Sequence, residues 1–140
     1  MVDRALLANA VLDDPAQLAR LEGIIHPLVA ASRDAFLLEA ANNGAGLVLL
    51  DIPLLFETGC ESFVDAVVLV TAPESVQKAR VWARPGMTAE RLAAILARQI
   101  PDADKRARAH FIIDTSRGFA AAEQQVREIV RTLAAAKNKV

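Results

Sequence analysis

Residues 47–57 read LVLLDIPLLFE, and this stretch decides how the rest of the chain is interpreted. It opens with a short apolar run between the turn residues 42–44 and Pro53, a pattern typical of a strand buried on both faces of a parallel sheet. We therefore predict a strand over residues 47–51, which must end near Pro53 because proline cannot donate a hydrogen bond to a neighbouring strand. Ligands of open α/β sheets bind beyond the carboxyl ends of the strands, so Asp51 lies where a functional group is expected.

Two more apolar runs, at residues 66–70 and 111–114, predict further short strands. Helical patterns lie between and after them, and the last helix is expected over about residues 119 to 135. Strands that alternate with helices indicate an α/β fold with a parallel sheet.

Capping residues predict where the helices begin and end. Starts are expected at Asp3, at Asp14-Pro15, at a capping box over Thr71–Glu74, at Thr88 and at Pro101-Asp102. Pro27 should kink the second helix or restart it, because proline removes one helical hydrogen bond. Asn43-Gly44 should end that helix.

The composition describes one globular domain. The chain has 140 residues, a hydrophobic content of 54% and a formal net charge of −1. This length allows a real core, the charge gives no electrostatic case for nucleic acid or an anionic membrane, and no apolar stretch is long enough to span a membrane. The single cysteine, Cys60, excludes an internal disulfide framework and a cysteine-based zinc cluster, and it favours the cytoplasm.

The chain has no glycine-rich phosphate loop, since neither G-x-x-x-x-G-K-[ST] nor G-x-G-x-x-G occurs in it. Two isolated histidines predict no metal site. Asp51 has two interpretations, because a carboxylate there either orders Mg²⁺ or a phosphate acceptor, or caps a turn at the strand end. Glu57 is more typical of a solvated carboxylate, and His26 of a residue at a helix kink than of a ligand.

Four arginines surround the predicted helix break near residues 84–87, namely Arg80, Arg84, Arg91 and Arg98. They fit the arginine-bearing lid of a phosphoryl-transfer enzyme, although a solvated basic face is the more ordinary interpretation. Residues 115–118 follow a strand and precede a helix, as nucleotide-contacting loops do and as many other loops do.

Several short motifs follow one another in a distinctive order. They are Asp3-Arg4, Leu21-Glu22, His26-Pro27, the run DIPLLFE at 51–57, Val64-Asp65, Gln77 with Arg80, Arg84, Gln99, Lys105 and Ile112-Ile113-Asp114. In this order they resemble the dephospho-CoA kinase family over nearly the whole chain, and the run Pro-Leu-Leu-Phe-Glu is specific to that family.

The resemblance implies a P-loop kinase fold, in which a parallel sheet has helices on both faces in three layers. It also implies transfer of the γ-phosphate of ATP, with Mg²⁺, to the ribose 3′-hydroxyl of dephospho-CoA. The implied catalytic residues are Asp51 and Arg84, the acceptor-binding residues are His26, Leu55, Phe56 and Glu57, and the ATP-binding residues are Arg80, Arg84, Thr115, Ser116 and Arg117. The implied parts of a single partial domain are acceptor-binding helices (1–45), core strands (46–72), a helix with the lid (73–110) and the last strand with its helix (111–140).

The chain also departs from the family pattern. The family begins with a strand, the P-loop and a second strand with the presumed catalytic aspartate, and roughly sixty residues of this kind are expected to be missing here. Smaller departures are Pro85 and His110, where aspartate is usual, and Thr115, where asparagine is usual.

A missing central strand would leave unpaired edges on the strands at 47–51 and 66–70. We expect those strands to pair directly, to bind a partner or another copy of the chain, or to be poorly stable. We also expect little or no turnover from this chain alone, because the phosphate cradle is absent. Two alternatives stay open, a similarly truncated kinase of another small metabolite and a non-catalytic module that binds CoA or a nucleotide.

Overall fold

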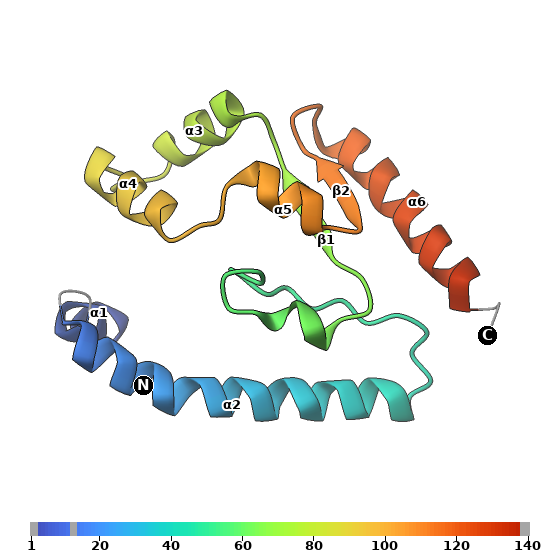
Figure 1. The fold of residues 1–140 in the computed structure, drawn as a ribbon, viewed down its shortest axis with the longest axis horizontal. Coiled ribbons are helices and arrows are strands. Elements are labelled where there is room, and N and C mark those ends of the chain that lie inside the picture. Colours follow the sequence, from blue (N-terminus) through green and yellow to red (C-terminus); the bar gives the residue numbers. More distant parts are fainter. Residues whose placement is uncertain (1–2, 12–13, 138–140) are drawn as a thin grey trace. The chain divides into compact units, whose positions relative to one another are not determined.

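The computed structural model describes residues 3–11 and 14–137. Figure 1 shows its elements, which are α1 (Arg4–Val11), α2 (Pro15–Asn42), the 3-10 helix η1 (Cys60–Phe63), β1 (Val68–Thr71), α3 (Glu74–Trp82), α4 (Ala89–Ala97), α5 (Asp102–Arg108), β2 (Phe111–Asp114) and α6 (Phe119–Lys137). The chain divides into two compact units, Met1–Leu49 and Leu50–Val140, and each is described by itself. The prediction of one partial domain stays a prediction.

The first unit consists of α1 and α2, and its caps form as predicted. Asp3 Oδ1 accepts the backbone N–H of Leu6 at 3.1 Å, and Asp14 caps α2 by accepting the N–H groups of Ala16 and Gln17. These bonds satisfy donors that the first turn of a helix leaves unpaired. None of the residues of α2 is buried within the described part of the chain.

Helix α2 continues through Pro27, so the predicted restart at this residue is wrong. A proline inside a helix removes one hydrogen bond, and the long helical stretches on both sides outweigh that loss. The predicted end is confirmed, because the N–H of Asn43 donates to Glu39 O and Gly44 has a φ of 70°.

The strand predicted over residues 47–51 does not form. Residues 47–52 have no regular secondary structure, and Leu49 is 82% exposed. The sheet of the described residues has two strands, β1 and β2. An apolar run is a strand only when a neighbour pairs with its backbone, and no such pairing reaches this stretch in the described part of the chain.

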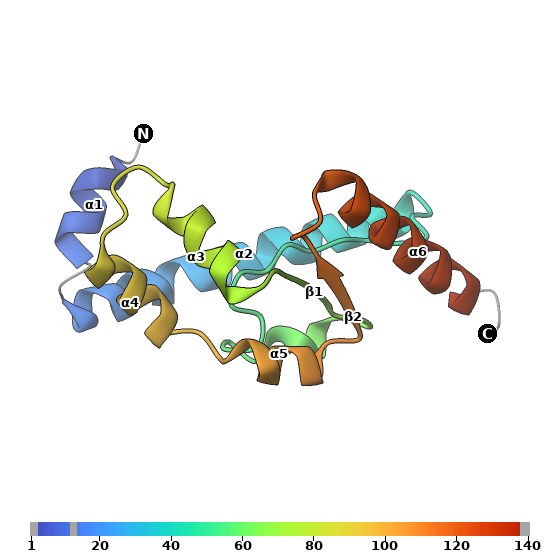
Figure 2. The same ribbon diagram turned by 90° about the horizontal axis from the view of Figure 1, so that it is seen from above.

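The second unit is built on these two parallel strands. Val68 pairs with Phe111 and Thr71 with Asp114, so the strands end together. Helix α5 contacts β1 and helix α6 contacts β2, and Figures 1 and 2 show each of these helices beside its strand. The buried apolar residues of the described chain are Phe56, Val67, Ala72 and Ile113.

These strands confirm the α/β class with a parallel sheet. The strand predicted at 66–70 is found at 68–71, and the one predicted at 111–114 has the same limits. The three-layer arrangement with helices on both faces stays a prediction.

Helix α3 begins at Glu74 with Pro73 as its cap residue, and no side chain caps it. The predicted capping box is therefore wrong, because Thr71 is the last residue of β1 and its hydroxyl bonds elsewhere. The N-cap of α4 is confirmed, since Thr88 accepts the N–H of Arg91. No helix among the described residues is long and apolar enough to cross a membrane.

Candidate functional site

The carboxyl ends of β1 and β2 lie side by side, where the topology of parallel sheets places ligands. The carbonyl of Thr71 accepts two hydrogen bonds from Thr115, from its N–H at 2.9 Å and from its hydroxyl at 3.0 Å. Residues 115–118, the β2–α6 loop, therefore begin directly beside the end of β1. In this loop the N–H of Ser116 donates to Asp114 Oδ1 at 2.8 Å.

Thr71 is the centre of a polar network. Its buried hydroxyl donates to Asp102 Oδ1 at 2.7 Å, and Asp102 Oδ2 accepts from Arg106 Nε at 2.5 Å. Gln77 Nε2 lies 3.4 Å from the same hydroxyl and donates to Ala72 O at 2.6 Å. The Arg106 guanidinium holds the pKa of Asp102 below its ordinary value, against partial burial and with help from Thr71. Helices α3 and α5 are thereby tied to the end of β1.

The two arginines predicted to contact ATP differ in their surroundings. Arg80 donates from Nη1 to Thr115 Oγ1 and from Nη2 to Thr115 O, both at 2.8 Å. Arg84 lies in the turn after α3 and is exposed, and its side chain has no hydrogen-bond or ion-pair partner among the described residues. Arg80 is thus built into the β2–α6 loop, whereas Arg84 is available to an incoming anion.

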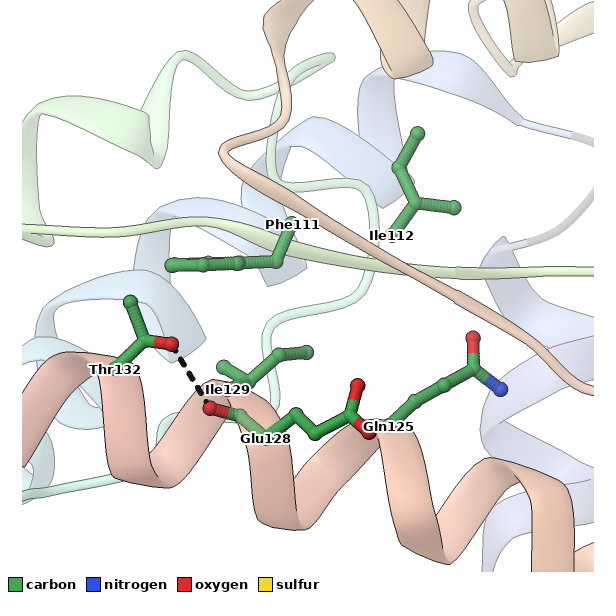
Figure 3. A pocket seen from close by; sticks show the side chains of 6 residues that line it. All are labelled: Phe111, Ile112, Gln125, Glu128, Ile129 and Thr132. Carbon is green, nitrogen blue, oxygen red and sulfur yellow. Dashed lines mark hydrogen bonds between the residues drawn. The ribbon is translucent and has the colours of Figure 1, made fainter.

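Two hollows lie beside β2 and α6. One, of about 350 Å³, adjoins the β2–α6 loop and is lined by Asp114, Arg117, Ala121, Gln124, Gln125 and Glu128. The other, of about 260 Å³, is lined by Phe111, Ile112, Gln125, Glu128, Ile129 and Thr132. Figure 3 shows Phe111 from β2 and Ile129 from α6 facing one another in the second hollow.

Gln125 lines both hollows and binds the backbone of Asp114. Its Oε1 accepts the N–H of Asp114 at 3.0 Å and its Nε2 donates to Asp114 O at 3.1 Å, as a neighbouring strand would. The hydrogen bonds of Ser116, with the positive charges of Arg106 and Arg117, keep the pKa of Asp114 below its ordinary value. The hollow beside the loop therefore has a carboxylate with a lowered pKa in its lining.

Residues 53–57, the PLLFE turn, are held by α5. Phe56 is buried, and the guanidinium carbon of Arg108 lies 4.4 Å from the centre of its ring. Glu57 accepts the N–H of Ile100 at 2.8 Å and pairs with Lys105 Nζ at 3.2 Å. Burial raises the pKa of Glu57, but these bonds outweigh it and hold the pKa below its ordinary value. The expectation that Glu57 is a solvated carboxylate is therefore wrong.

Two of the predicted site residues, Asp51 and His26, make no side-chain hydrogen bond among the described residues. Asp51 is exposed in the second unit, and no described side chain bonds to it. His26 is exposed on α2 in the first unit, so it is not part of the network above. The roles assigned to all these residues stay predictions. In the described ranges no three carboxylate, histidine or cysteine side chains gather as they would around a metal ion.

Sequence reasoning missed Asp102 and Arg106 as part of this network. Their spacing of four residues on a short helix is a signal for an ion pair, but nothing in the pattern points that pair at Thr71. Lys105 and Gln99 belong to the family resemblance, and the structure adds that Lys105 Nζ lies 3.4 Å from Gln99 Oε1 as well as contacting Glu57.

A parallel α/β sheet with polar loops at the strand ends, and an arginine whose side chain is unpaired in the described part of the chain, fits the class of nucleotide-dependent phosphoryl-transfer proteins. The sequence profile of the CoaE family, dephospho-CoA kinase, matches residues 1–121. The chain belongs to the dephospho-CoA kinase family, whose members are ATP-dependent kinases. The resemblance seen in the sequence is confirmed.

Relatives and solved structures agree with this membership. A dephospho-CoA kinase of Mesorhizobium japonicum is 58% identical over 133 residues, which cover 95% of this chain and 68% of that protein. One from Rhodopseudomonas palustris is 54% identical and covers 95% and 67%. The crystal structure of TT1252 from Thermus thermophilus has a TM-score of 0.75 at 35% identity, with 93% of this chain and 66% of that one covered.

Dephospho-CoA kinase from Campylobacter jejuni, at 22% identity and a TM-score of 0.60, supports the fold alone. The match covers 94% of this chain and 64% of that one. The chain thus spans about two thirds of the length of the proteins it matches. These comparisons do not confirm the expectation that the first strands and the P-loop region are missing.

Proposed function

We propose that this chain serves the transfer of the ATP γ-phosphate to the ribose 3′-hydroxyl of dephospho-CoA. The observation that carries this proposal is the 58% identity to a curated dephospho-CoA kinase over 95% of the chain. The polar network at the strand ends supports it, because that network lies where α/β enzymes bind nucleotides.

The nucleotide side consists of the β2–α6 loop and the hollow beside it. Thr115, Ser116 and Arg117 approach the adenine, and Arg80 supports the loop through Thr115. Arg84 contacts the transferring phosphoryl group. The loose transition state of this reaction spreads negative charge over the phosphoryl oxygens, and an arginine free of other partners stabilises that charge.

Asp51 fits a role beside the phosphates and Mg²⁺. The ion keeps several water ligands and takes one or two carboxylates together with substrate phosphates, and Asp51 is an exposed carboxylate with no partner among the described side chains. Bound Mg²⁺ would neutralise charge on the phosphates. The contribution of Asp51 itself is a negatively charged carboxylate oxygen beside the ion and the phosphates.

Acceptor binding is assigned to Leu55, Phe56 and Glu57 of the second unit and, separately, to His26 of the first unit. The proposal for these four residues rests on the family motifs. Within the PLLFE turn, the burial of Phe56 and the ion pair of Glu57 favour a supporting role over direct contact with the acceptor.

The strand edges support a further part of the proposal, which is self-association. Each strand of the two-stranded sheet has one edge without a strand partner, and open edges pair with other chains. Gln125 already occupies the edge of β2 at Asp114, so association would use the edge of β1.

The test is a binding and turnover experiment on the 140-residue chain. Calorimetry should detect dephospho-CoA binding and should rank it above CoA and adenosine. ADP release should be far below ordinary kinase rates, roughly 1–100 per second, because the sequence has no G-x-x-x-x-G-K-[ST] motif. Binding of another metabolite in preference to dephospho-CoA would contradict the proposal, while tight binding of dephospho-CoA without any effect of ATP would favour a non-catalytic module.

A further inference from the structure

Leu54 has a backbone conformation that leucine rarely adopts. Its φ is 57°, and among the described residues no other non-glycine residue has a positive φ. This left-handed region brings Cβ too close to the following carbonyl oxygen. A conformation of this kind persists only where surrounding structure holds it, and such places are often functional.

Hydrogen bonds to the residues just after the PLLFE turn stabilise part of this conformation. The carbonyl of Leu54 accepts the N–H of Thr58 at 3.0 Å and its hydroxyl at 2.9 Å. The carbonyl of Leu55 accepts the N–H of Cys60 at 2.9 Å. These local bonds define the turn, but they do not connect it to the rest of the unit.

Glu57 makes that connection. The residue that donates to it, Ile100, is 43 positions away in the sequence and stands just before α5. The Glu57 and Lys105 side chains are only 12% and 16% exposed. Removing either Glu57 or Lys105 would leave the other charge unpaired in a largely buried place. Loss of one partner should therefore destabilise this part of the unit.

Arg108 forms a second connection from the same helix. Its guanidinium lies over the Phe56 ring and pairs with Glu61. Helix α5 therefore contacts the second half of the turn, at Phe56 and Glu57, while Leu54, two residues before Phe56, is 38% exposed. The buried residues of the turn face the protein, and the residue with the unfavourable backbone is presented to solvent.

We propose that Glu57 is a positioning residue, which holds the PLLFE turn through Ile100 and Lys105 so that Leu54 contacts the nucleoside part of the acceptor. This inference rests on the proposed function. An apolar side chain can lie against a base or ribose face and has nothing to offer a phosphate. Dephospho-CoA has two uncharged ends, the nucleoside and the pantetheine arm, and the nucleoside is the one that carries the accepting ribose hydroxyl. Glu57 then acts through the turn and does not touch the acceptor.

The first arm of the test uses hydrogen exchange on the unliganded chain. Glu57→Ala removes both bonds, and Glu57→Gln keeps an oxygen for Ile100 but loses the ion pair. The Ile100 amide should exchange about tenfold faster in Glu57→Ala and less so in Glu57→Gln. Lys105→Met should raise exchange at Ile100 as much as Glu57→Gln does. The double variant, with Glu57→Gln and Lys105→Met together, should raise it little further because the two residues share one interaction. Glu74→Gln, which removes an exposed pair with Lys78, is the control and should change nothing at Ile100.

The second arm measures dephospho-CoA and ATP affinity by calorimetry. Glycine adopts a φ of 57° without strain, so Leu54→Gly removes the side chain and should keep the Ile100 amide protected. It should weaken the affinity for dephospho-CoA about tenfold. Glu57→Gln should weaken the affinity for dephospho-CoA and leave the affinity for ATP unchanged. A general loss of stability would weaken both affinities.

Two results would overturn the inference. One is unchanged exchange at Ile100 in Glu57→Ala. The other is wild-type affinity for dephospho-CoA in both Leu54→Gly and Glu57→Ala. If the wild-type chain itself fails to bind dephospho-CoA, the proposed function fails, and the exchange arm still decides whether Glu57 holds the turn.

Discussion

The two halves of the candidate site are held in different ways by the same short helix. On the nucleotide side, Asp102 and Arg106 of α5 join the hydroxyl of Thr71 in a network of hydrogen bonds. On the acceptor side, Lys105 of α5 forms an ion pair with Glu57 of the PLLFE turn, and Arg108 contacts the buried ring of Phe56 and pairs with Glu61 beyond the turn.

The difference lies in strain. On the nucleotide side the positive φ of 88° falls on Gly118, where it causes no strain, whereas the acceptor side contains Leu54 at a φ of 57°. A relaxed network needs few supports, because each bond only adds to a geometry that the strands already define. A strained turn depends on its supports, so we expect perturbations to cost more on the acceptor side.

The largest effect is expected from Phe56→Ala. Phe56 is 8% exposed, and its removal should lower the free energy of unfolding by about 3 kcal/mol, as measured by urea denaturation. Phe119→Ala is the matched control, because Phe119 is 86% exposed and its loss should cost less than about 0.5 kcal/mol. Equal effects of the two substitutions would mean that α5 does not bury the turn.

Arg80→Lys should have a smaller effect, confined to the nucleotide side. Lysine cannot reproduce the two parallel bonds to Thr115, and these bonds are exposed, so the loss should be about 0.5–1 kcal/mol. Hydrogen exchange in the β2–α6 loop should rise, while the PLLFE turn stays protected. Arg84→Lys, at a residue without a described partner, should change neither. A rise in exchange at the PLLFE turn in Arg80→Lys would show that the two halves are not held separately.

The sequence predicted the parts of this site that depend on local patterns. The limits of β2 and the N-caps at Asp14 and Thr88 follow from apolar runs and capping residues. The strand at 47–51 could not be predicted reliably, because an apolar run specifies a tendency to be buried and leaves open which backbone will pair with it.

The tertiary contacts of the polar residues were out of reach for a different reason. Thr71 looked like a helix cap, and only the position of α5 against β1 reveals Asp102 as its partner. Arg80 looked like a lid arginine, and only the register of β1 and β2 brings Thr115 within its reach. Motif order located the family correctly but could not separate residues that touch substrate from those that support them.

The support that Glu57 gives to the PLLFE turn should depend on pH. Its pKa in the folded chain lies below the ordinary value of 4.5, so its bonds stabilise the fold fully above that value. As the pH falls below 4.5 and through the lowered pKa, Glu57 takes up a proton and this contribution is lost. The difference in unfolding free energy between wild type and Glu57→Gln should be about 1 kcal/mol at pH 7 and should shrink as the pH falls below 4.5 and Glu57 becomes protonated. Asp102 and Asp114 also have lowered pKa values, but they titrate in both proteins and cancel in the difference.

Glu74→Gln is the control for an exposed ion pair. Its effect on the free energy of unfolding should be removed by added salt. A difference for Glu57→Gln that salt also removes, or that does not shrink at all as the pH falls, would show that the ionised Glu57–Lys105 pair is not the main support of the strained turn.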